Sequence, residues 1–186
     1  MKHKIINLKN LIFFSLILVF SLGLASCKSH KKSKVEQPVY VGEVVETKLK
    51  GKQKKKKTVG EQIVEESLTW VGTPYGYGKN EKGVATDCSG LVVTVYEKVA
   101  GIKLPRNSAE QAEWCEELKE KHVSPGDLVF FATGKDKHKV SHVGIMMDKE
   151  QFVHSSGTKG VIISEMTTPY YQRTFIKFGR VPGFEE

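Results

Sequence analysis

The spacing of the apolar residues divides the chain into a helical part and a strand-rich part. Apolar side chains follow one side of a helix from 58 to about 70, surround a helix from 88 to 100, and recur from 108 to 118. Beyond 127 they form short β-branched or aromatic runs between polar turns, at 128–131, 143–147, 152–155, 161–164 and 175–181. Helices followed by neighbouring strands indicate an α+β fold, with about three N-terminal helices packed on a five- to six-stranded antiparallel sheet.

Capping residues support these helices. Thr58 and Ser108 each stand three residues before a Glu or a Gln, which is the spacing of a capping box. Asp87 is a suitable N-cap for the second helix, and Gly101 is a suitable stop. This places Cys88 in the first turn of a buried helix, where free backbone N–H groups and the helix dipole favour a thiolate.

Residues 1–26 have the layout of a secretory signal. A lysine-rich start precedes an apolar segment from 11 to 22, which is shorter than the roughly 20 residues that span a membrane. The segment ends in Leu24-Ala25-Ser26-Cys27, which resembles the bacterial lipobox. The resemblance implies that Cys27 carries fatty acyl chains such as palmitate and anchors an exported protein to a membrane. A cleaved signal with a chance cysteine is the alternative. Lys28 favours the outer membrane by analogy, with the protein facing the periplasm.

The basic charge belongs to the segment after the signal. Residues 28–57 carry eleven lysines against three glutamates, whereas residues 58–186 carry fifteen Lys and Arg against eighteen Asp and Glu. The segment 27–57 therefore reads as a lipidated cysteine followed by a solvated tether, and 58–186 as the folded domain. The tether acts as a spacer or adds attraction to anionic headgroups or wall polymers. A mildly acidic domain argues against nucleic-acid binding.

Two histidines could serve the Cys88 thiol as a base. The other four lie in the leader, the tether or lysine-rich loops, whereas His142 and His154 lie in strand-like runs. Antiparallel strands joined by a turn near Lys149 would bring these two together. Cysteine and histidine within hydrogen-bond reach form a nucleophile and its base. A three-ligand zinc site and a purely structural cysteine are the alternatives, but no CxxC spacing supports a metal, and the three ligands would come from separate elements.

Several short motifs, taken in order, resemble the NlpC-type cell-wall cysteine peptidases, a papain-like family. They are Pro74-Tyr75-Gly76-Tyr77-Gly78, Asp87-Cys88-Ser89-Gly90, Leu104-Pro105-Arg106-Asn107-Ser108, Pro125-Gly126-Asp127-Leu128, Ser141-His142-Val143-Gly144-Ile145 and His154. The resemblance covers about 58–183. It implies a monomeric peptidoglycan endopeptidase without cofactor or metal, cleaving stem-peptide amide bonds of the D-γ-glutamyl-diaminopimelate type or in a cross-link.

The resemblance also implies roles for individual residues. Cys88 attacks the scissile carbonyl, His142 moves the proton, and His154 orients His142. Tyr75 and the Cys88 N–H stabilise the oxyanion. The substrate contacts are assigned to Asp87, Ser89, Ser108, Arg106 and Tyr77.

Each assignment has a simpler alternative. Asp87, Ser89 and Ser108 could be helix caps, Tyr75 and Tyr77 packing aromatics, and Arg106 a structural ion pair. One departure concerns the aromatic loop, which in the family ends Gly-Gly but here continues from Gly78 to Lys79. It leaves the shape of the groove, and hence the bond preference, open. Another amide hydrolase or acyltransferase on the same scaffold, and a non-catalytic wall-binding lipoprotein, are the alternative functions.

Overall fold

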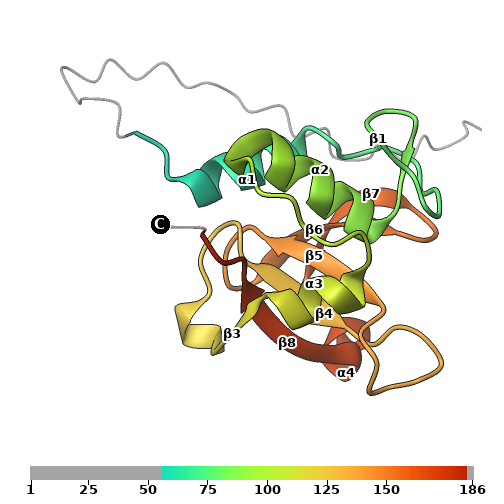
Figure 1. Cartoon of the computed structure of the whole chain (residues 1–186). Helices are drawn as coiled ribbons and strands as arrows, with labels where there is room; N and C mark the ends of the chain where they lie inside the picture. The colour runs from blue at the N-terminus through green and yellow to red at the C-terminus, as the bar shows by residue number, and fades with distance from the viewer. Residues whose placement is uncertain (1–55, 184–186) are drawn as a thin grey trace, which may run out of the picture. The chain divides into compact units, whose positions relative to one another are not determined.

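The computed structural model describes residues 56–183, in which helices and a six-stranded sheet form an α+β domain (Figure 1). The helices are α1 (Val59–Leu68), α2 (Cys88–Ala100), α3 (Ser108–Trp114), the 3-10 helix η2 (Glu120–His122) and α4 (Pro169–Thr174). The strands are β1 (Asn80–Glu81), β2 (Ala85–Thr86), β3 (Glu116–Leu118), β4 (Leu128–Phe131), β5 (His142–Met146), β6 (Gln151–Ser156), β7 (Gly160–Glu165) and β8 (Phe175–Arg180). The predicted α+β class is confirmed.

The sheet is antiparallel, with the strand order β3-β8-β4-β5-β6-β7. All four residues of β4 are buried, as expected for a strand covered on both faces. Strands β5 and β6 are joined by a short turn and pair with Ile145 opposite Val153. This register carries His142, at the start of β5, and His154, in β6, toward the same end of the sheet.

Two apolar clusters fill the faces of the sheet. On one face, α1 and α2 pack against alternate strand residues, in a cluster that includes Ile63, Leu91, Val95 and Val153. On the other face, Phe131, Phe152 and Phe178 form a smaller cluster that contacts Tyr171 of α4. Figure 1 shows α1 and α2 on one side of the sheet and α4 near the opposite side.

The Pro125-Gly126-Asp127-Leu128 motif anchors the central strands. The buried Asp127 carboxylate accepts hydrogen bonds from Arg180 Nε and Nη2, both at 2.8 Å, and from the Ser124 N–H at 2.8 Å. The Asp127 carbonyl accepts from the Met146 N–H at 2.7 Å. These bonds tie the start of β4 to the neighbouring strands β5 and β8.

The third helix differs from its prediction at both ends. Its N-cap is Asn107, whose side chain accepts from the Glu110 N–H at 2.9 Å, and Ser108 is the first helical residue. Asparagine caps as well as serine does, and Asn107 has the extended backbone of a cap. The helix ends at Trp114 because the chain then pairs with β8 as β3, so the predicted extension to Leu118 is wrong.

The sequence signals for a lipid anchor lie outside the described residues. The signal segment 1–26, Cys27 and most of the tether fall before residue 56, so their predictions stay predictions. Between residues 56 and 183, the structure contains no helix with the length and apolar character needed to cross a membrane.

Candidate active site

Cys88 is the first residue of α2, and its helix start is fixed by Asp87. The Asp87 carboxylate accepts from the Gly90 N–H at 2.7 Å, which is the predicted N-cap. The helix then ends at Gly101 in the left-handed conformation, also as predicted. Cys88 is partly exposed and lines a groove of about 790 Å³ together with Tyr75, His142 and His154.

A buried hydrogen bond positions the nucleophile relative to the histidine strands. Ser155 of β6 donates its hydroxyl to the carbonyl of Thr86 at 2.7 Å, and both residues are fully buried. Thr86 lies two residues before Cys88, and Ser155 follows His154. The start of α2 is therefore held beside β6 in a fixed position.

Gly90 lets the backbone of Lys79 lie close to the first turn of α2. A Cβ added there would lie 2.4 Å from the backbone carbonyl oxygen of Lys79, which is well inside contact distance. The same carbonyl accepts from the Asp87 N–H at 3.0 Å. Lys79 stands where the family pattern has a second glycine, but its backbone carbonyl still contacts the start of α2. Its side chain is exposed.

The two predicted histidines are in direct contact. His142 Nε2 lies 2.8 Å from His154 Nδ1, and the two rings meet edge to face. His154 Nε2 lies 3.0 Å from Ser164 Oγ and 3.1 Å from the hydroxyl of Tyr171. Because Nε2 of His142 is occupied by His154, Nδ1 is the ring nitrogen left for the Cys88 thiol.

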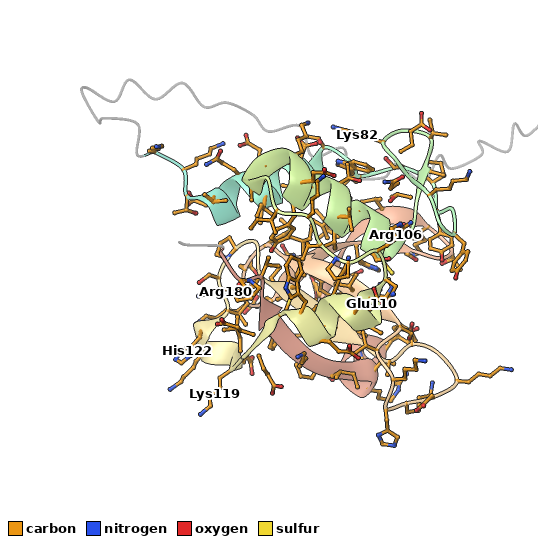
Figure 2. The ribbon with its side chains drawn as sticks, in the orientation of Figure 1. Lys82, Arg106, Glu110, Lys119, His122 and Arg180 are labelled. Atoms are coloured by element: carbon orange, nitrogen blue, oxygen red, sulfur yellow. The ribbon has the colours of Figure 1, made fainter. Side chains whose placement is uncertain are left out.

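Arg106 forms a hydrogen-bonded cluster with the two residues that flank the nucleophile. Its guanidinium donates to both carboxylate oxygens of Asp87, each at 2.9 Å, and to Ser89 Oγ at 2.9 Å. Figure 2 shows Arg106 beside the first turn of α2. The structure therefore brings together three residues that the sequence assigned to substrate contact, and it binds them to each other.

The sequence pattern of the NlpC/P60 family matches residues 72–180, more than half of the chain. The chain belongs to the NlpC/P60 family. The predicted membership and the class of a cysteine-peptidase hydrolase are thereby confirmed.

Curated relatives cover the same domain. The "probable endopeptidase NlpC" of Escherichia coli is 34% identical over 90% of this chain and 99% of its own length. The murein DD-endopeptidase MepS of the same species is 36% identical over 66% of this chain and 63% of its own length. The bifunctional muramidase/DL-endopeptidase CwlT of Bacillus subtilis is 32% identical, and the match spans half of that longer protein.

Solved structures share the fold. A Staphylococcus aureus family member described as similar to a lipoprotein superposes with a TM-score of 0.60 at 30% identity, over 70% of this chain and 45% of that one. A Bacillus cereus NlpC/P60 protein gives a TM-score of 0.60 at 29% identity, over 65% of this chain and 39% of that one. The match therefore spans less than half of either crystallised chain.

Burial keeps the reacting groups of this NlpC/P60 domain neutral at rest. It lowers the pKa of His142 to about 4, and burial together with the adjacent His142 lowers the pKa of His154 to about 3. Burial also raises the pKa of the Cys88 thiol. The Val143 N–H opposes this shift, and the Asp87 carboxylate adds to it. The expectation of a thiolate favoured by the helix start is thus corrected, because loss of water outweighs the helix N–H groups.

The charge of Asp87 is preserved despite its burial. Burial raises the pKa of this carboxyl, but hydrogen bonds from Arg106 and from the N–H groups of Gly90 and Gly78 outweigh it, so the pKa lies below its ordinary value. The predicted capping and ion-pair roles of Asp87 and Arg106 are both present. Substrate contact by Asp87 and Ser89 stays a prediction.

Replacing Arg106 by methionine should destabilise the domain by about 2 kcal/mol. Removing one partner of a buried ion pair costs roughly 3–5 kcal/mol, but the Arg106 side chain is 43% exposed and Asp87 retains its bonds from Gly90 and Gly78. Urea unfolding measures the difference. Arg173→Met, at an exposed position in α4, is the matched control and should change stability by less than about 0.5 kcal/mol. Equal stability of the two variants would contradict the structural role of the pair.

Of the other predicted site residues, Tyr75 lines the groove, and Tyr77 and Ser108 do not. Tyr75 lines it, 39% exposed, and its pKa is raised by burial and by the neighbouring Cys88. Tyr77 is 89% exposed and is not among the residues that line this groove. Ser108 is buried at the start of α3 and is likewise not in the lining.

The described part of the chain contains two cysteines, and neither forms a disulfide. Cys88 and Cys115 are both free, and Cys115 is buried. Within residues 56–183 no group of three or more His, Cys, Asp and Glu side chains is arranged to hold a metal ion, so Cys88, His142 and His154 do not form the three-ligand zinc cluster.

The sequence analysis did not identify two of the side chains that contact His154. Ser164 lies in β7, and Tyr171 lies in α4, a helix that the sequence analysis did not predict. A signal for α4 was present, since Pro169 stands at its first position, where proline is favoured. Nothing in the local pattern indicates that either hydroxyl faces a histidine.

Proposed function

We propose that this protein is a peptidoglycan endopeptidase that hydrolyses stem-peptide amide bonds with Cys88, His142 and His154. The observation that carries the proposal is the groove that is lined both by a partly exposed cysteine at a helix start and by a pair of hydrogen-bonded histidines. Curated relatives named as murein endopeptidases and DL-endopeptidases support the substrate class.

The geometry supports a two-stage acyl transfer. As Sγ of Cys88 bonds to the scissile carbonyl carbon, its proton passes to Nδ1 of His142, and the carbonyl oxygen becomes an oxyanion. Collapse of this intermediate breaks the C–N bond, and His142 returns the proton to the leaving amine. Water then attacks the thioester with His142 as base, and the acid product leaves as the thiol is restored.

The remaining residues assist these steps. His142 Nε2 lies 2.8 Å from His154 Nδ1, and the mechanism uses the tautomer in which His154 accepts the Nε2–H of His142, which leaves Nδ1 unprotonated and available as a base. The Cys88 N–H and the Tyr75 hydroxyl are the proposed donors to the oxyanion. Because the Cys88 thiol and the His142 ring are both neutral at rest, the mechanism is general-base activation, in which proton transfer accompanies the attack.

The groove suits a peptide with several polar groups. Hydroxyl side chains such as Ser141, Ser156 and Thr158 line it, and Tyr170 adds an aromatic surface. Lys159, which directly precedes β7, and Glu165, its last residue, also line the groove. Stem peptides that join glutamate to a diamino acid carry free carboxylates and amino groups, which match such a lining.

The scissile bond can be identified by analysis of products. Purified peptidoglycan and defined muropeptides should yield fragments cut at the bond between D-glutamate and diaminopimelate, and mass spectrometry assigns that bond. Loss of cross-linked dimers without cleavage within free stems would instead identify a cross-link endopeptidase. Release of no fragment from any of these substrates would contradict the proposed function.

A wall-binding protein without activity is the competing function. A Mycobacterium tuberculosis relative of the fold, RipD, is described as a non-catalytic NlpC/P60 protein adapted to peptidoglycan binding. The presence of Cys88, His142 and His154 favours catalysis here. Binding to peptidoglycan without product release would favour the alternative, and transfer of an acyl group to an amine would favour an acyltransferase.

The proposal includes attachment to the cell envelope. The lipobox-like segment at Cys27 and the lysine-rich tether support an enzyme held at the outer membrane, facing the periplasm. Cys27→Ala should release the protein into the soluble fraction of the envelope. Fractionation followed by immunoblotting measures this change, and unchanged membrane association would contradict the lipid anchor.

A further inference from the structure

His154 has two hydroxyl partners on the side away from His142. Its Nε2 lies 3.0 Å from Ser164 Oγ and 3.1 Å from the Tyr171 hydroxyl, and these two hydroxyls lie 3.4 Å apart. Ser164 comes from β7 and Tyr171 from α4, so two different elements converge on one ring nitrogen. The contacts continue the line that begins at His142.

The surroundings of His154 make these partners important. The side chain is 1% exposed, and its ring packs against Phe152 and Tyr171 at centroid distances of 5.0 and 5.5 Å. A buried ring N–H without an acceptor costs roughly 1–3 kcal/mol. The protonation of Nε2 therefore depends on the two hydroxyls.

The hydrogen-bonded histidine pair has two possible proton arrangements. In the first, His142 donates its Nε2–H to His154 Nδ1, and His154 carries its own proton on Nε2. His142 Nδ1 is then a free base. In the second, His154 donates from Nδ1, so the single proton of neutral His142 sits on Nδ1. That nitrogen cannot then accept the thiol proton.

Only the first arrangement supports the chemistry, and it requires an acceptor for the His154 Nε2–H. Ser164 accepts this proton and can donate its own toward Tyr171, so that all three hydrogen bonds run away from Cys88. The negative end of each dipole then points toward His142, which also stabilises the imidazolium formed during attack.

We propose that Ser164 and Tyr171 are positioning residues that jointly fix the tautomer of His154, and through it the basic nitrogen of His142. The proposal rests on the proposed function for its catalytic consequence but not for the tautomer itself. Either hydroxyl alone can accept the Nε2–H, because each lies within hydrogen-bond distance of it. The two side chains are therefore redundant.

Redundancy gives a specific pattern of kinetic effects. Ser164→Ala and Tyr171→Phe should each lower kcat on a defined muropeptide by less than about threefold. The double variant should lower kcat by roughly 10- to 100-fold, the range found when the partners that orient a metal-ligating histidine are removed. KM should change little, since the lost contacts lie behind the histidines.

Two further variants serve as controls. Ser164→Thr in the Tyr171→Phe background keeps a hydroxyl and should restore most of the lost rate. Ser67→Ala removes a buried hydroxyl of α1, which donates to the Val64 carbonyl and does not line the groove, and should leave kcat unchanged. Circular dichroism and thermal unfolding establish that each variant is folded.

NMR of the full chain labelled with ¹⁵N-histidine reads the tautomer without any substrate. In the wild-type protein at neutral pH, both His142 and His154 should carry their proton on Nε2, and the double variant should shift both toward Nδ1–H. Nδ1–H on His154 in the wild-type protein would overturn the proposal, even if the variants failed to fold. So would a double variant that retains full kcat.

The two proposals can fail separately. If the wild-type protein shows the expected tautomers but cleaves no peptidoglycan, the proposed function is wrong and the hydroxyl pair stands. If it cleaves peptidoglycan and the double variant is as active as the wild type, the hydroxyl pair is wrong and the proposed function stands.

Discussion

Cys88→Ala is expected to lower the turnover of muropeptides by at least about 10⁴-fold. The substitution removes the atom that forms the acyl-enzyme, and loss of a nucleophile from a catalytic triad costs on the order of 10⁶ in kcat in a well-studied protease. The fold should persist, because Cys88 is partly exposed and Asp87 still caps α2. Product release from a defined muropeptide, followed by chromatography, measures the effect.

Cys115→Ala is the matched control for this result. Cys115 is also a free cysteine, but it is buried in the apolar cluster between the helices and the sheet and is not among the residues lining the groove. Its substitution should cost about 1 kcal/mol of stability and leave kcat near the wild-type value. Full activity in Cys88→Ala would eliminate covalent catalysis by this residue, whatever the control shows.

The stability of the domain should fall steeply between pH 6.5 and pH 4. Burial depresses the folded-state pKa of His142 to about 4 and that of His154 to about 3, whereas unfolding returns both toward 6.5. The unfolded state therefore binds more protons in this interval, and stability is complete above pH 6.5 and lost as pH falls through the folded values. For His142 alone the loss is on the order of 3 kcal/mol.

Urea unfolding at a series of pH values measures the slope of this loss. His142→Gln and His154→Gln should each flatten the curve, because each removes one proton taken up on unfolding. Gln172→Ala, at an exposed position in α4, replaces no titrating group and should leave the slope unchanged. A stability that is constant from pH 7 to pH 4.5 would show that the two rings are not held neutral by burial.

Local signals in the sequence were enough to predict the elements that carry the nucleophile. At Thr58 the hydroxyl accepts from the Glu61 N–H, and the Glu61 carboxylate accepts from the Thr58 N–H, as the capping-box spacing indicated. Asp87 and Gly101 bound α2 for equally local reasons. The short β-branched and aromatic runs around β5 and β6, with the turn near Lys149 between them, were sufficient to predict that His142 and His154 would meet.

Contacts between distant elements could not be predicted in this way. Whether Arg106 pairs with Asp87 or faces solvent depends on how the loop before α3 folds over α2. Tyr171 reaches His154 only because α4 packs under the sheet. The state of the Cys88 thiol was misjudged because the helix start is visible in the sequence, whereas the loss of water around the sulfur is not.

Cys88 lies in α2, and His142 and His154 lie in β5 and β6. Along the chain, α3, β3, η2 and β4 separate α2 from these two strands. Joining them closes a long loop, and the entropy lost in that closure is recovered only when the helices dock on the completed sheet. A chain that is still being synthesised, or held unfolded, carries the thiol but has no partner to activate it. Hydrolytic capacity should therefore emerge late in folding, together with the most non-local contacts, so that the nascent polypeptide cannot attack amides at random.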